Sequence, residues 1–153
     1  MCYDEKYMHL ALAQAQKAAL ADEVPIGAVL LSPTGQLLVQ CHNQTIGNND
    51  PTAHAEILAL REACGQIHNY RLTNYTLYTT IEPCIMCMGA LIHARVGRVC
   101  FGAYDDKWGG CGSICNLAED SRLNHRIEVV GGLLETECRE VIQRFFAKKR
   151  IRK

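Results

Sequence analysis

The sequence predicts an α/β protein with a mixed five-stranded sheet covered by helices on both faces. Three observations indicate this fold: an early pair of apolar strands joined by a tight turn, a later alternation of helix and strand patterns, and helical patterns at both ends. The chain has 153 residues and no internal repeat or Pro/Gly-rich linker. We therefore expect residues 1–153 to form a single domain.

The first half of the chain begins with a helix followed by a hairpin. Residues 3–21 lack helix breakers and are rich in Ala, Leu, Gln and Lys, which favours a helix. The apolar run 26–31 is typical of a buried strand. After a turn of Ser, Pro, Thr and Gly, residues 36–43 return as a second strand.

Two shorter helices are expected in the middle of the chain. One runs from about Pro51 to Cys64, and the other runs from Pro83 to about His93. In each case a residue suited to an N-cap, Asp50 or Glu82, stands directly before a proline at the first helical position.

Three further strands and a closing helix complete the expected fold. The strands are 76–80, which is dense in β-branched and aromatic residues, 98–103 and 127–130. A loop over 105–113 contains the single tryptophan, Trp108. The closing helix carries an apolar stripe of Leu134, Cys138, Val141, Ile142 and Phe145.

Composition points to an ordinary globular protein of a reducing compartment. The start of the chain lacks the pattern of a signal peptide, and no apolar segment is long enough to span a bilayer. We therefore expect a cytoplasmic location and no membrane partner. Nine cysteines at mostly irregular spacing favour a metal site over a disulfide framework.

The overall charge gives no sign of a nucleic-acid partner, because the formal net charge is zero. The exception is residues 148–153, a basic tail with five Lys or Arg. On composition alone, such a tail is more often a solvated helix end than a binding arm.

Two fragments carry the chemistry: His54-Ala55-Glu56, and Pro83 to Cys87 with cysteines at 84 and 87. Cys84 and Cys87 are three residues apart, so they project from the same face of a helix. A helix N-terminus lowers thiol pKa values, and zinc binds thiolates. With His54 they make three ligands, the number at which zinc keeps an open position for water.

Glu56 discriminates between a catalytic and a structural zinc site. Residues i and i+2 lie nearly opposite on a regular helix, so His54 and Glu56 reach one cavity only if the helix end points into it. A carboxylate beside a zinc-activated water moves protons without binding the metal. The alternative is a closed structural site with Cys100, Cys111 or His93 as the fourth ligand.

The pattern H-x-E followed by P-C-x-x-C is the signature of zinc-dependent deaminases. Together with segments 23–29, 50–56, 69–72, 82–87, 92–95, 99–103 and 124–126, it resembles the bacterial tRNA-specific adenosine deaminases over nearly the whole chain. The zinc fragments alone are shared with cytosine, guanine, deoxycytidylate and riboflavin-pathway deaminases.

This resemblance implies a three-layer α/β/α fold of the cytidine deaminase type and hydrolytic conversion of adenosine to inosine at the wobble position of a tRNA anticodon. It implies one Zn²⁺ per chain on His54, Cys84 and Cys87, with Glu56 as the catalytic residue. The substrate-binding positions that it implies are Asn43, Ala55, Asp105, Lys107 and Phe146.

The resemblance also implies a tRNA anticodon loop as partner and a homodimer. Met88 and Leu91 could equally well lie at a dimer interface or in the core. The basic tail could contact phosphates or could be a solvated helix end. The alternative function in the same class is a free-base or nucleotide deaminase of the guanine or cytosine type. The alternative in another class is a binding module stabilised by structural zinc.

Overall fold

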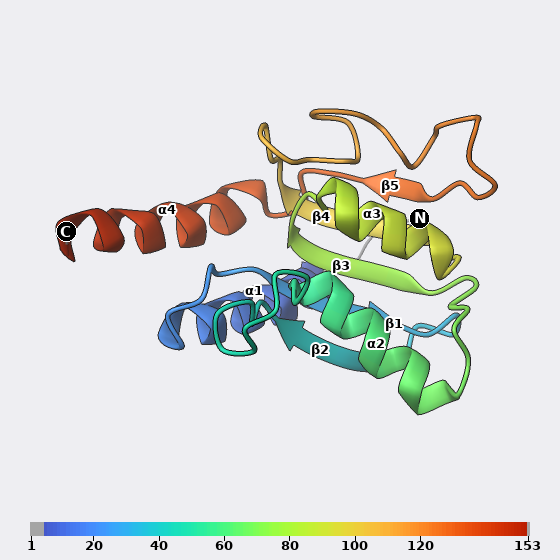
Figure 1. The fold of residues 1–153 in the computed structure, drawn as a ribbon, viewed down its shortest axis with the longest axis horizontal. Coiled ribbons are helices and arrows are strands. Elements are labelled where there is room, and N and C mark those ends of the chain that lie inside the picture. Colours follow the sequence, from blue (N-terminus) through green and yellow to red (C-terminus); the bar gives the residue numbers. More distant parts are fainter. Residues whose placement is uncertain (1–4, 153) are drawn as a thin grey trace.

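The computed structural model describes residues 5–152 as one five-stranded sheet with helices on both faces (Figure 1). In chain order, the elements are α1 Glu5–Leu20, β1 Gly27–Leu31, β2 Leu37–His42, α2 Ala55–Ile67, β3 Thr76–Ile81, α3 Ile85–His93, β4 Arg98–Ala103, β5 Glu128–Val130 and α4 Glu135–Arg152. The predicted fold class is confirmed. The predicted residues 3 and 4 of the first helix lie outside the described residues. No helix within 5–152 combines the length and the apolarity needed to cross a membrane.

The strand directions gather several chain segments at one edge of the sheet. The strand order is β2-β1-β3-β4-β5. β1 is antiparallel to both of its neighbours, whereas β3, β4 and β5 are parallel. Four strands therefore run in the same direction, and their carboxyl ends share the edge from which α4 projects (Figure 1). In open α/β sheets this edge is where ligands bind.

The core lies in two layers because successive side chains of a strand point to opposite faces. In β1, Ala28 and Leu30 pack with α2 and α3, while Val29 and Leu31 pack with α1 and α4. Every residue of β1 is buried, as the apolar run predicted. A Cβ at position 27 would overlap the backbone of α1, so Gly27 permits this helix to lie directly on the sheet.

Two residues that suited either an interface or the core belong to the core. Met88 and Leu91 are fully buried among residues of the same chain, on the inner face of α3.

The predicted starts of α2 and α3 are wrong. α2 begins at Ala55, not at Pro51, and its N-cap is His54. α3 begins at Ile85, not at Pro83, and its N-cap is Cys84. In both places the proline precedes the helix: Pro51 lies in a turn and Pro83 in an irregular segment after β3.

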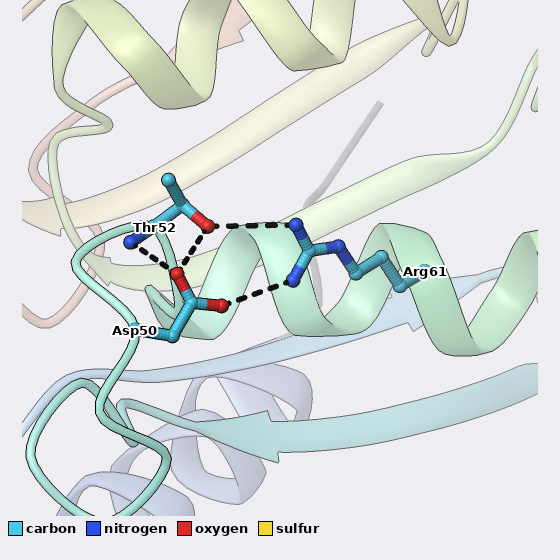
Figure 2. Close-up of polar contacts among 3 residues, drawn as sticks. All are labelled: Asp50, Thr52 and Arg61. Carbon is cyan, nitrogen blue, oxygen red and sulfur yellow. Dashed lines mark hydrogen bonds and ion pairs between the residues drawn. The ribbon is translucent and has the colours of Figure 1, made fainter.

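The carboxylates assigned as N-caps have other hydrogen-bond donors. Asp50 accepts hydrogen bonds from the backbone N–H and the hydroxyl of Thr52, at 2.9 and 2.7 Å. Arg61, on α2, bridges both residues at 3.4 Å (Figure 2). Glu82 bonds to a distant loop described below. α3 ends at His93 as predicted, whereas α2 continues to Ile67, beyond the predicted end at Cys64.

Candidate active site

A cavity of about 920 Å³ opens at the carboxyl edge of the sheet. Asn43 follows β2 and Glu82 follows β3 directly, and Asp105 comes soon after β4, so the strand directions bring all three to this cavity. Of the predicted site residues, the cavity is lined by Asn43, His54, Glu56, Cys84, Asp105, Lys107 and Phe146. The other two, Ala55 and Cys87, are fully buried and are not lining residues.

The three predicted metal ligands lie together. The Nδ1 atom of His54 lies 3.6 Å from Sγ of Cys84 and 3.5 Å from Sγ of Cys87. A tetrahedral zinc ion with bonds of about 2.3 Å to sulfur and about 2.05 Å to nitrogen separates those donors by about 3.6 Å. The residues therefore fit zinc both in donor type and in spacing.

The backbone explains how residues 30 positions apart come to face one point. His54 and Cys84 are both N-caps with extended backbone, at φ −69° and −72°. Cys87 lies in the first turn of α3, and its N–H donates to Sγ of Cys84 at 3.5 Å. Each donor thus sits at the positive end of a helix, where an anionic ligand is stabilised.

Proton sharing within the cluster favours one thiolate. Hydrogen bonds from the Cys87 side chain, and then from the His54 ring, lower the pKa of the Cys84 thiol to about 4. The pKa of the Cys87 thiol is raised, chiefly by the same hydrogen bond and by burial. The lowered pKa favours the thiolate form of Cys84, which is the form that binds a metal cation.

The structure does not assemble the closed site considered above. Within residues 5–152, no fourth His, Cys, Asp or Glu joins the cluster of His54, Cys84 and Cys87. Cys111 instead contacts the sulfur of Met88 at 3.0 Å. Cys100 packs on the α1 side of the sheet, and His93 is exposed at the far end of α3.

Glu56 lies in the first turn of α2, with only 2% of its surface exposed. Its Oε1 atom has no hydrogen-bond partner among the described residues. Burial raises the pKa of this carboxyl to about 7. Because His54 precedes the helix in extended conformation, the opposite faces expected for i and i+2 do not separate it from Glu56. Both line the cavity.

Hydrogen bonds among Asp50, Thr52 and Arg61 hold the backbone turn that precedes His54 (Figure 2). Arg61 reaches back along α2 and ties the preceding turn to the helix body. Ala53, next to His54, is fully buried, and its carbonyl accepts the Gln44 N–H at 3.0 Å. The segment that leads into His54 is therefore tied to α2 and to Gln44 by contacts that the sequence pattern did not reveal.

Sequence analysis missed the role of Glu82, which is 1% exposed and lines the cavity. Its carboxylate accepts hydrogen bonds from a single loop, through the backbone N–H groups of Asp105, Cys111 and Ser113. The only sequence signal was an acidic residue beside a proline at the end of a strand, and it was assigned to capping. Contacts to backbone N–H groups leave no trace in side-chain patterning.

Comparison with known protein families identifies the family of this chain. The model of the cytidine and deoxycytidylate deaminase zinc-binding region matches residues 1–103. The chain belongs to this deaminase family. The deaminase is 47% identical over 148 residues to the tRNA-specific adenosine deaminase of Haemophilus influenzae, covering 97% of this chain and 86% of that one. It is 44% identical over 153 residues to the tRNA-specific adenosine deaminase of Bacillus subtilis, covering 100% and 94%.

Solved structures agree with the fold of this deaminase. A structure from a study of A-to-I editing by tRNA:A34 deaminases at the wobble position superposes with a TM-score of 0.87 at 40% identity, covering 90% of this chain and 99% of that one. A guanine deaminase from Nitrosomonas europaea superposes with a TM-score of 0.83 at 24% identity, covering 96% and 86%. The second likeness shows the shared fold alone.

Proposed function

We propose that this deaminase hydrolyses adenosine to inosine at the wobble position of a tRNA anticodon. The observation that carries the proposal is the buried Glu56 carboxylate, whose Oε1 atom has no hydrogen-bond partner among the described residues. Glu56 lines the same cavity as His54 and Cys84 of the three-donor His/Cys/Cys cluster. A cluster of three donors leaves a metal position open for water. The substrate assignment is supported by relatives that are named tRNA-specific adenosine deaminases at 41–47% identity.

In this proposal His54, Cys84 and Cys87 hold one zinc ion per chain. When bound, zinc lowers the pKa of a water molecule toward neutrality and so supplies the nucleophile. Glu56 accepts a proton from the attacking water as the new C–O bond forms at C6 of adenine. It then delivers a proton to the amino group, which leaves as ammonia when the C–N bond breaks. A carboxyl whose pKa lies near neutrality suits both transfers.

The remaining site residues would hold an extruded base. Asn43 is buried, lines the cavity and offers an amide to the purine. Ala55 is fully buried between His54 and Glu56 in the chain and does not itself line the cavity. Asp105, Lys107 and Phe146 line the mouth, where a flanking base or phosphate would lie. An anticodon loop presents bases that are already unpaired, so extrusion costs less than in a duplex.

The geometry of the mouth favours RNA over a free base. Trp108 and Phe146 line the cavity with 65% and 42% of their surfaces exposed, more than a single enclosed base requires. Exposed aromatic rings beside a lysine are typical of single-stranded nucleic-acid sites.

A direct assay separates the candidate functions. The purified zinc-loaded protein is incubated with an anticodon stem-loop carrying adenosine, and separately with guanine and with cytosine. We expect inosine in the stem-loop. Ammonia from free bases alone would reject the proposed substrate, and no product from any of them would favour a binding module.

We also propose that the enzyme works in the cytoplasm as a homodimer. Ile85 and Met86, exposed apolar side chains at the start of α3, line the rim of the cavity next to Cys84, and a partner subunit that covers them would complete the cavity wall. Light scattering coupled to size-exclusion chromatography should give twice the chain mass of 17.0 kDa. A monomer at assay concentration would reject the dimer.

A further inference from the structure

The loop from Asp105 to Ser113 forms one wall of the cavity mouth and is built around the Glu82 carboxylate. Oε1 accepts the N–H of Asp105 at 3.2 Å and the hydroxyl of Ser113. Oε2 accepts the N–H groups of Cys111 and Ser113 at 3.0 and 3.1 Å. These donors are neutral groups of a single loop, so the carboxylate holds the two ends of that loop at one point.

The contact extends from Glu82 to the residues that face the substrate. Oδ1 of Asp105 accepts the N–H groups of Lys107 and Trp108 at 3.0 and 3.2 Å. The Asp105 carbonyl accepts the N–H of Gly109 at 2.9 Å. Because the Asp105 N–H is itself bound to Glu82, these backbone positions form one connected turn. The loop therefore presents Lys107 and Trp108 from a fixed base.

The packing leaves this arrangement little freedom. A Cβ at Gly109 would overlap the carboxylate, so the loop lies directly against Glu82. Gly109 also bridges to Cys84, and the N–H of Gly110 donates to the Pro83 carbonyl at 2.8 Å. The wall of the mouth is thus joined to the N-cap of α3.

We propose that Glu82 is a positioning residue for substrate binding: through the Asp105 N–H it fixes the loop that presents Lys107 and Trp108 to the RNA beside the extruded base. This inference rests on the proposed function for its substrate. A carboxylate is required because it offers about four acceptor sites and no donor, matching the donors of the loop. Its burial without those donors would be strongly unfavourable.

Glu82→Gln tests the requirement for acceptors. The amide carries one acceptor oxygen and one N–H₂ group, so it can satisfy one pair of donors only. If the amide oxygen takes the place of Oε2, it still accepts the N–H groups of Cys111 and Ser113. The N–H₂ group then replaces Oε1 and can donate to the Ser113 hydroxyl, which rotates to accept. The Asp105 N–H, however, faces another donor and loses its hydrogen bond. The variant should therefore release the Asp105 end of the loop selectively.

The expected result is a rise in KM for the anticodon stem-loop of about tenfold, with kcat within about twofold of the parent and unchanged zinc content. In a Lys107→Ala/Trp108→Ala background, the same change should alter KM by less than about twofold, because the loop then has nothing to present. A KM effect that persists in this background, or a loss confined to kcat, would overturn the proposal.

Two controls separate positioning from stability. Thr80→Val removes a buried acceptor on β3, the hydroxyl that accepts the Gly27 N–H at 3.1 Å, without touching the loop. It should lower the melting temperature and leave KM unchanged. Equal KM values for the Thr80 and Glu82 variants would overturn the proposal. If Glu82→Gln does not fold, Gly109→Ala pushes the loop from an intact carboxylate and should raise KM in its place.

Hydrogen exchange tests the inference independently of the substrate. In the zinc-loaded Glu82→Gln protein, amides of 105–113 should exchange at least about tenfold faster than in the parent, with α2 unchanged. Unchanged exchange of the loop would overturn the inference even if the enzyme edits RNA. Faster exchange in a protein with no activity on RNA would instead reject the proposed function and retain the role of Glu82 in holding the loop.

Discussion

His54 Nδ1 and Cys84 Sγ lie 3.6 Å apart although 30 positions of chain separate them, and each residue is the N-cap of a helix. Two helix N-termini therefore point at one position, and the first turn of each adds a further functional group, Glu56 from α2 and Cys87 from α3. The arrangement concentrates positive dipole ends where thiolates and developing negative charge must be stabilised.

Loss of one donor should remove the metal. We expect Cys87→Ala to purify with little zinc and no deaminase activity, because two donors hold zinc weakly. A chelator should inactivate the parent protein, and added zinc should restore the parent but not the variant. Zinc measured by mass spectrometry provides the readout. Cys64→Ala, on α2 outside the cluster, is the matched control and should retain one zinc per chain. Full zinc occupancy in the Cys87 variant would contradict the ligand set.

Glu56→Gln should separate catalysis from metal binding. Removal of a general acid–base group typically costs about 10²–10⁴-fold in rate, so we expect a loss of that size in single-turnover deamination. Zinc content should not change, because Glu56 is outside the donor cluster. The melting temperature should stay equal or rise, since the variant no longer buries an ionisable carboxyl whose Oε1 lacks a partner. Surviving turnover would show that another group moves the protons.

Trp108→Ala should weaken binding of the stem-loop. A base stacked on an aromatic side chain contributes about 1–3 kcal/mol, so the dissociation constant should rise roughly 5- to 150-fold. Trp108→Phe should retain most of the affinity because a ring remains. Ile114→Ala removes an exposed apolar side chain outside the cavity lining and serves as control. Equal affinities for the Trp108→Ala variant and the parent would remove this ring from the RNA site.

The basic tail should contribute unequally to RNA binding. Its residues 148–152 form the end of α4, where Lys149 Nζ lies 2.7 Å from Asp22 Oδ1. Lys148 and Arg150 are exposed. Truncation after Ala147 should weaken binding and flatten its dependence on salt, since each lost phosphate contact reduces the slope by somewhat under one. Lys148→Ala should reproduce part of that change and Lys149→Ala less. An unchanged salt dependence of RNA binding after truncation would show that the tail is a solvated helix end with no role in binding.

The order and type of the elements could be predicted because burial imposes periods on the sequence. The run at β1 and the stripe of Cys138, Val141 and Phe145 on α4 are patterns of side chains that must leave water. The starts of α2 and α3 could not be predicted in this way. Asp50 is a typical N-cap residue and Glu82 repeats its position before a proline. In the structure Asp50 binds Thr52 in the preceding turn and Glu82 binds a distant loop, so His54 and Cys84 are the N-caps.

The sequence by itself determined which donors are present and that a carboxylate accompanies them, because metals and proton transfers require particular side chains. It left a fourth donor possible, and only the structure shows that none of Cys100, Cys111 and His93 joins the cluster. Only the tertiary structure decided how these groups are held. The shared edge of the strands brings Asn43, Glu82 and Asp105 together, and the Glu82 carboxylate organises a loop through its backbone N–H groups. Every residue except proline carries a backbone N–H group. Which of these groups reaches a carboxylate therefore depends on the course of the backbone in the folded protein, and the identity of the donating residue does not reveal it.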